Sequence, residues 1–327
     1  MNLSTRDKEK PFVLMAAAAT GLALQHFIAE AVPALLYVTE IGVFLVIVAV
    51  MLPVDLTDVG QAAKRLKPTA LAVFINFVLV PLVSWTSGWL ILRQYPDIWV
   101  GAILYTITPC IGWYLIFTDI AKGNVAWGIA LLPWNVTLQV LLLPVYLYFL
   151  VGKVLPVDFW ALARSVGLYL VAPFVLSAAL RPVIIRTRGY DYFNGPFKRT
   201  LGEVKLWALV VVIVSMFVSQ EPLGFYELSR VSLLILFLIA FFLVFFLVAL
   251  LAGRLFALSY EDNATLAFST TARNSEAVIG VAVSAFPGHP LVYLAIILGP
   301  VVELPMLLVI ARILLALKDR IEKVSAT

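Results

Sequence analysis

The residues best suited to chemistry lie in one short polar stretch inside an apolar segment. Residues 106–112 have the sequence Thr-Ile-Thr-Pro-Cys-Ile-Gly and include Cys110, the single cysteine of the chain. A helix that reaches Pro109 loses a backbone hydrogen bond there, and Gly112 weakens the next turn. The pattern predicts an interrupted helix that forms a binding site, with Cys110 at that site. A kinked packing helix with an inert, buried cysteine is the alternative.

A second polar stretch carries charge. Residues 265–277 contain Arg273 and Glu276, which are three positions apart and share one face if the segment is helical. A charge at the centre of a membrane helix costs about 2.5–3.5 kcal/mol on insertion scales, so such residues are retained for a function. We expect a coupling-ion or proton site at Glu276. A structural ion pair that joins two helices is the alternative.

Three further polar side chains interrupt apolar segments. Glu303 lies between the helix breakers Pro300 and Pro305, where it serves ion coupling or, as a protonated carboxyl, bonds the backbone amides freed by the kink. Asn135 and Gln139 are one helical turn apart. Their amides can join helices by hydrogen bonds, or their oxygens can bind a substrate or a hard cation. The sequence leaves both pairs of alternatives open.

Composition places these residues in a membrane protein. The chain is 63% hydrophobic and 13% charged, with a mean hydropathy of +1.03, whereas a soluble domain is about half apolar and a quarter charged. One cysteine excludes an internal disulfide and a multi-cysteine metal cage. The net charge of +4 is typical of cytoplasmic loops rich in Lys and Arg and gives no sign of nucleic acid as a partner. The partners we expect are the lipid bilayer and a small-molecule substrate.

Ten stretches are long and apolar enough to be spans, which need about 20 residues. They lie at 11–30, 34–53, 68–92, 98–119, 124–151, 157–180, 204–220, 229–257, 261–286 and 289–317. With the N-terminus in the cytoplasm, eighteen Lys and Arg residues fall in cytoplasmic segments and three in outside loops. This bias predicts a multi-pass protein of the plasma (inner) membrane with both termini cytoplasmic.

The spans divide into two halves of five. The longest loop, 181–203, is basic and is predicted to be a cytoplasmic connector between repeat one (11–152) and repeat two (157–317) of a single transporter domain covering 1–327. An odd number of spans per half forces the second half to run opposite to the first, as in the inverted repeats of many secondary transporters. Leu132-Pro133 is echoed by Gly299-Pro300 at an offset of 167. At that offset the spans 98–119 and 261–286 are equivalent and cross near the membrane centre.

The chain carries no sign of an enzyme or a cofactor. It contains no Walker-type phosphate loop, no paired-cysteine metal site and no nucleophile with a base at a suggestive spacing. Transport must therefore be driven by an ion gradient or by the gradient of the substrate itself. Charges at mid-membrane depth argue against a receptor or scaffold without transport activity.

Five motifs in order resemble the arsenite-efflux permeases of the arsenical-resistance type, within the bile acid:sodium symporter superfamily. They are Pro109-Cys110-Ile111, residues 119–124 (Asp-Ile-Ala-Lys-Gly-Asn), residues 135–139 (Asn-Val-Thr-Leu-Gln), Asn274-Ser275-Glu276 and residues 299–305 (Gly-Pro-Val-Val-Glu-Leu-Pro). The resemblance implies an all-α fold of ten transmembrane helices in two inverted five-helix repeats. It also implies a core domain (spans three to five and eight to ten), a panel domain (the other four spans), and broken helices that cross at the substrate site.

The resemblance also implies functional residues. Cys110 and Glu276 match the functional cysteine and glutamate of the arsenite branch, where efflux runs against proton entry. We therefore predict a substrate site of Cys110, Asn135, Gln139, Arg273 and Asn274, with Cys110 contacting the transported arsenic and with Glu276 and Glu303 serving ion or proton coupling. The coupling ion is H⁺, or Na⁺ if the protein is instead a symporter of organic anions in which Arg273 holds a carboxylate or sulfonate.

The sequence departs from the arsenite branch at the site itself. Arg273 stands where that branch usually has a neutral asparagine, and Ser275 where it has an aromatic residue. Thr108-Pro109 replaces small and basic residues before the cysteine, and Thr118 replaces an asparagine. These changes bear on the substrate more than on the superfamily. One variant of the organic-anion hypothesis has Arg273 replace the coupling cation electrostatically.

Overall fold

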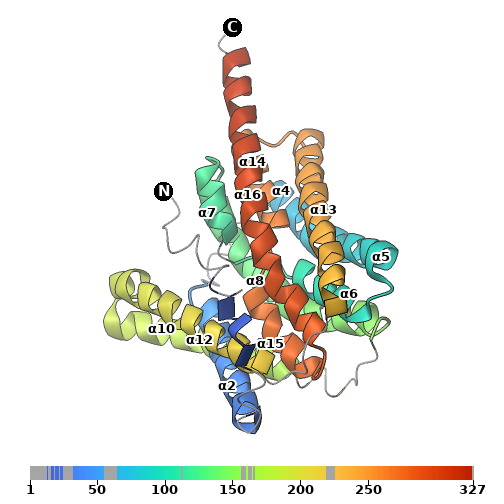
Figure 1. Cartoon of the computed structure of the whole chain (residues 1–327). Helices are drawn as coiled ribbons and strands as arrows, with labels where there is room; N and C mark the ends of the chain where they lie inside the picture. Colours follow the sequence, from blue (N-terminus) through green and yellow to red (C-terminus); the bar gives the residue numbers. More distant parts are fainter. Residues whose placement is uncertain are drawn as a thin grey trace.

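The computed structural model consists of helices joined by short segments (Figure 1), with no strand in the part of the chain that it describes. The described residues are 32–54, 65–111, 113–155, 166–218 and 225–325, together with 160, 164 and single positions between 13 and 24. The first predicted span, 11–30, therefore lies largely outside the described residues.

Long helices lie at the positions of seven predicted spans. They are α2 (Val32–Met51), α4 with η3 and α5 (Leu66–Phe74, Ile75–Leu79, Val80–Leu92), α8 with η4 (Val125–Tyr146, Leu147–Val151), η5 with α10 (Gly167–Val171, Ala172–Arg188), α12 (Lys198–Val218), α13 (Phe225–Leu255) and α16 (Pro290–Ser325). Within the described ranges, five helices are long and apolar enough to cross a membrane. The chain is thus a polytopic, all-helical membrane protein.

The segment 181–203 differs from its prediction as a loop. Helix α10 continues to Arg188, and two short helical pieces, α11 (Tyr190–Tyr192) and η6 (Phe193–Phe197), lead directly into α12. Only Gly189 interrupts the helical backbone, at a φ of 87° that side chains disfavour. The basic residues that suggested a loop instead occupy helices, with Arg186 and Arg188 in the last turn of α10, where cations stabilise the helix end.

Two predicted spans are each broken into two helices. The span predicted at 98–119 consists of α6 (Pro96–Thr106) and α7 (Trp113–Ile120), and the span at 261–286 consists of α14 (Tyr260–Thr271) and α15 (Ser275–Ala285). The breaks fall at the polar stretches that the sequence singled out. The prediction of broken helices is therefore confirmed at both positions.

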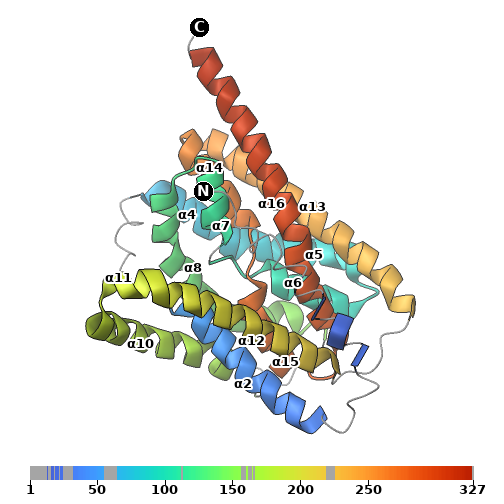
Figure 2. The ribbon, with the colours of Figure 1, turned by 60° about the vertical axis from the view of Figure 1, so that its left-hand side comes forward.

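The helices pack as two groups, which Figure 2 separates. In the first, α2 packs along α12 and against α10, and we call it the α2–α12 group. In the second, α16 packs against α6 and α13, which also contact α5, while α14 packs against α13 and α7; we call it the α6–α16 group. Helix α15 contacts α2 of the first group and both α6 and α16 of the second. The second half of one broken helix thus lies where the two groups meet.

Candidate functional site

The two helix interruptions pair with each other through their backbones. Residues 108–110 and 272–274 run antiparallel and form a β-bridge between Pro109 and Arg273. The flanking hydrogen bonds run from Cys110 N–H to Ala272 O at 3.1 Å and from Asn274 N–H to Thr108 O at 2.9 Å. Backbone groups freed by a broken helix are costly in lipid unless protein satisfies them. Each interruption therefore supplies hydrogen-bond partners that the other needs, and we call the place where they meet the crossing.

Side chains complete this crossing. The Thr106 hydroxyl donates to Ala102 O at 2.7 Å, and the Thr108 hydroxyl lies within hydrogen-bonding distance of Tyr105 O and of Asn274 O. Asn274 is the N-cap of α15, because its Oδ1 accepts a hydrogen bond from Ala277 N–H at 3.1 Å. The threonines and the asparagine that stood out in the apolar sequence thus end and begin helices.

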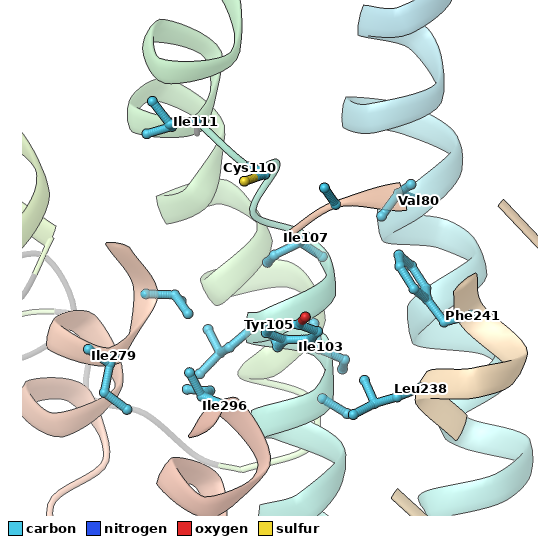
Figure 3. Close-up of a cluster of buried hydrophobic side chains, with 14 of the residues drawn as sticks. Val80, Ile103, Tyr105, Ile107, Cys110, Ile111, Leu238, Phe241, Ile279 and Ile296 are labelled. Atoms are coloured by element: carbon cyan, nitrogen blue, oxygen red, sulfur yellow. The ribbon is translucent and has the colours of Figure 1, made fainter. Parts of the chain in front are cut away.

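Cys110 sits at the start of α7 and is 3% exposed. Its Sγ accepts a hydrogen bond from Trp113 N–H at 3.2 Å, at the amide end of the helix, which carries positive partial charge. Figure 3 shows Cys110 on the extended segment beyond Tyr105 and Ile107. A sulfur held at an electropositive helix end is suited to act as a soft ligand.

Arg273 is buried among oxygen acceptors at the end of α14 and is 2% exposed. Its Nε donates to Thr271 O at 3.2 Å, and its Nη2 donates to Thr270 O and to Asn76 Oδ1, the latter at 3.1 Å. The guanidinium carbon lies 5.2 Å from the centre of the Phe241 ring, a cation–π distance. Its Nη1 has no hydrogen-bond partner within the described residues.

The predicted helical pairing of Arg273 with Glu276 assumed a continuous helix, and this assumption was wrong. Helix α14 ends at Thr271, so Arg273 lies in extended backbone two residues beyond it. Glu276 is in the first turn of α15, and its side chain lies outside the described residues. The acidic partner that the structure describes near Arg273 comes instead from α16.

Glu303 is that acidic residue, and it is 2% exposed between the two prolines of α16. Its Oε1 accepts a hydrogen bond from the backbone N–H of Arg273 at 3.0 Å, and its Oε2 accepts one from the Tyr105 hydroxyl at 2.5 Å. Both carboxylate oxygens therefore act as acceptors, which matches an ionised carboxylate. Glu303 ties α16 to α6 and to the second interruption.

Sequence reasoning missed Asn76 and Tyr105, which complete this charged cluster. Asn76 is fully buried, and its Nδ2 donates to Ser269 O at 3.0 Å while its Oδ1 faces Arg273. It lies in η3, a π-helical turn, a feature frequent at functional sites. A lone asparagine in the apolar stretch 68–92 was the available signal. Tyr105 gave none, because a tyrosine in an apolar helix is ordinary.

A cavity of about 500 Å³ lies between the two helix groups, next to the crossing. One wall holds four predicted site residues, Cys110, Arg273, Asn274 and Glu303, and the opposite wall comes from α2 and α12. Lys198 and Lys205 of α12 also line it, although the sequence placed Lys198 in the connector and Lys205 at the start of the span 204–220. The structure therefore brings four of the predicted site residues to one cavity and adds two lysines.

Asn135 and Gln139 do not line this cavity. Both are buried in α8, at 1% and 2% exposure, and α8 contacts the cavity through Leu132. Asn135 Nδ2 and both amide atoms of Gln139 have no hydrogen-bond partner within the described residues. Across the same residues, no group of three or more His, Cys, Asp or Glu side chains is arranged to hold a metal ion.

Comparison with known proteins gives consistent relatives. A family model described as "Sodium Bile acid symporter family" matches residues 40–223, more than half of the 327 residues. The arsenical-resistance protein Acr3 of Corynebacterium glutamicum is 23% identical over 325 residues, covering 93% of this chain and 87% of the relative. The Acr3 protein of Alkaliphilus metalliredigens is 22% identical (83% and 79% covered), and the uncharacterized transporter slr0944 of Synechocystis is 24% identical (84% and 76%).

Proposed function

The chain belongs to the sodium bile acid symporter family, a family of membrane transporters, and on this premise we propose that it exports arsenite with Cys110 as the arsenic ligand. The observation that carries the proposal is the position of Cys110, whose side chain lies in a helix break on the wall of a cavity of about 500 Å³. The two Acr3 relatives, named for arsenical resistance, support the choice of substrate.

The chemistry of arsenite fits a single thiol. At neutral pH arsenite is a small, uncharged trihydroxide with a thiophilic centre, and a soft thiolate is its natural ligand. Three cysteines would hold it too tightly for turnover, whereas one can bind and release it. The single cysteine of the chain, hydrogen-bonded at the start of α7, meets this requirement.

The proposal includes a topology of ten spans in two inverted five-helix repeats. The protein lies in the plasma (inner) membrane with both termini in the cytoplasm. Two features support this topology: each expected repeat contains one broken helix, and the breaks meet in an antiparallel bridge. The bridge pairs Pro109 with Arg273, which are 164 residues apart. This separation is close to the offset of 167 that the proline echo suggested between the two repeats.

The α6–α16 group corresponds to the expected core domain and the α2–α12 group to the panel. In the proposed cycle, arsenite enters the cavity from the cytoplasm and Cys110 binds it. Glu276 then accepts a proton from outside, and the core moves against the panel so that arsenite leaves outward. A cavity that runs from the crossing to Lys198, at the start of the basic α12, is in keeping with an inward-open arrangement.

The test is arsenite uptake into everted membrane vesicles under a proton gradient and, separately, a sodium gradient. We expect wild-type uptake that needs the proton gradient, and normal uptake in the matched control Ile111→Val. Uptake by Cys110→Ala should fall at least about 100-fold, because losing even an outer-shell partner of a metal ligand costs about 10–100-fold. If Cys110→Ala takes up arsenite at the wild-type rate, no thiol of this protein binds the arsenic. Uptake driven by the sodium gradient alone would exclude proton antiport.

A second candidate function, transport of an organic anion, is favoured by a different observation. Lys198 and Lys205 line the cavity together with Arg273, and a volume of about 500 Å³ suits a ligand much larger than arsenite. Cationic side chains around an apolar cavity can hold a carboxylate or sulfonate. Vesicles that take up no arsenite but take up an organic acid, and lose that uptake in Lys205→Gln, would establish this candidate.

A further inference from the structure

The guanidinium of Arg273 occupies a position built of cation ligands. Its donors meet the carbonyl oxygens of Thr270 and Thr271, which are among the last of α14, and the amide oxygen of Asn76. The last carbonyls of a helix lack helical partners and form the electronegative end of its dipole. In transporters with broken helices, such ends coordinate the coupling Na⁺ or H⁺.

Asn76 is fixed so that its oxygen faces this position. Its Nδ2 donates to Ser269 O at 3.0 Å, which leaves Oδ1 for Arg273 Nη2 at 3.1 Å. The reverse orientation would set two acceptors against each other at Ser269 and two donors against each other at Arg273. The Phe241 ring, 5.2 Å from the guanidinium carbon, adds a further electron-rich surface.

Among the side chains that the structure describes here, the charges balance without a bound ion. Glu303 contributes one negative charge beside this position, since both of its oxygens accept hydrogen bonds, and Arg273 contributes one positive charge. Both residues are 2% exposed. A second cation among the same oxygens would leave a net positive charge buried in apolar surroundings, which is strongly unfavourable.

We infer that the Arg273 guanidinium is a tethered cation, which replaces an alkali coupling ion at the end of α14 and makes this protein independent of Na⁺ and K⁺. This inference rests on the proposed transport function and deepens it by giving a structural reason why the cycle needs no sodium. When the guanidinium is absent, the oxygens of Thr270, Thr271 and Asn76 form a site for a small monovalent cation.

The experiment measures thermal unfolding of the purified full-length protein in detergent, in NaCl, KCl and choline chloride at equal ionic strength. The wild type and Arg273→Lys, which keeps the charge, are expected to unfold at the same temperature in all three salts. Arg273→Gln is expected to be less stable in choline and to gain about 3 °C on addition of Na⁺, with a saturable dependence on its concentration. The matched control Arg254→Gln removes an exposed positive charge from α13 and is expected to show no sodium effect.

The transport arm repeats the vesicle assay in the same salts. Wild-type flux is expected to be equal in Na⁺ and choline, and Arg273→Gln flux to fall at least about tenfold in choline and to recover in part with Na⁺, the scale of a lost ion ligand. The thermal arm needs no substrate, so failure to transport arsenite would defeat the proposed function and leave this inference standing.

Three results would overturn the inference. The first is a wild type that Na⁺ stabilises or activates. The second is an Arg273→Gln protein that folds and ignores Na⁺ in both arms. The third is an Arg273→Lys protein with the same sodium response as Arg273→Gln, since charge would then not be the relevant property. If Arg273→Gln yields no folded protein in any salt, the wild type and Arg273→Lys decide the matter.

Discussion

The two helix interruptions have the same architecture but carry different functional groups. The interruption after α6 carries a sulfur atom, and the one at 272–274 carries a guanidinium that binds the end of its own helix α14 and a buried amide. Both border the same cavity. Under the proposed function, the first interruption meets the substrate, while the second holds the crossing together. Substitutions around the second should therefore cost folding stability, and substitutions in the first should cost transport.

The largest effect on stability is expected for Glu303→Ala. It removes the acceptor of Tyr105 and of the Arg273 backbone and leaves a buried guanidinium without its counter-charge. Breaking a buried charged pair on one side costs about 3–5 kcal/mol. Urea denaturation in detergent, followed by tryptophan fluorescence, measures the loss. Glu303→Gln, which removes the charge but keeps one acceptor oxygen, should lose less. A loss equal to that of Glu303→Ala would assign the whole effect to the charge, and no loss at all would show that the charge contributes nothing.

Tyr105→Phe tests the same cluster with a smaller change. The substitution keeps the ring and deletes only the hydroxyl that donates to Glu303 at 2.5 Å. A hydrogen bond to a charged group contributes about 1.5–3 kcal/mol, and the free energy of unfolding should fall by that amount. The effect should be less than additive with Glu303→Ala, because the hydroxyl has lost its acceptor in that background. Full additivity in the double mutant would contradict the contact.

Asn274→Ala removes the N-cap of α15 within the second interruption. Its Oδ1 accepts a hydrogen bond from Ala277 N–H at 3.1 Å, and loss of such a cap costs about 1 kcal/mol. Asn274→Ser retains a capping oxygen and should recover most of that free energy of unfolding in the same denaturation experiment. If serine is no better than alanine, the side chain serves the cavity and not the helix.

The sequence predicted the architecture of the crossing better than its contacts. Pro109 and the polar run that ends in Asn274 signal where helices must stop, because proline lacks an amide hydrogen and asparagine caps helices. Both breaks lie where those residues predict. Local rules of this kind do not depend on distant parts of the chain, so a sequence can reveal them.

The contacts depend on packing between distant segments, and there the sequence was less informative. Asn76, Tyr105 and Glu303 come from three different helices and meet only because those helices pack around Arg273 or its backbone. Spacing placed Arg273 and Glu276 on one helical face, but α14 ends at Thr271, so the two residues do not share a helix. Asn135 and Gln139 are one turn apart and buried, yet they lie away from the cavity wall.

The smallest effect on stability is expected for Cys110→Ala, together with the largest difference between the loss of stability and the loss of transport. The side chain already borders a cavity, so deleting one sulfur atom should cost no more than about 0.8 kcal/mol of unfolding free energy, the value of one buried methylene. Export of a thiophilic substrate should nevertheless be lost, since no other thiol is present. Measured side by side, Tyr105→Phe should be the less stable protein and Cys110→Ala the less active one. A Cys110→Ala protein as unstable as Tyr105→Phe would make the cysteine a packing residue and would remove the division of roles between the two interruptions.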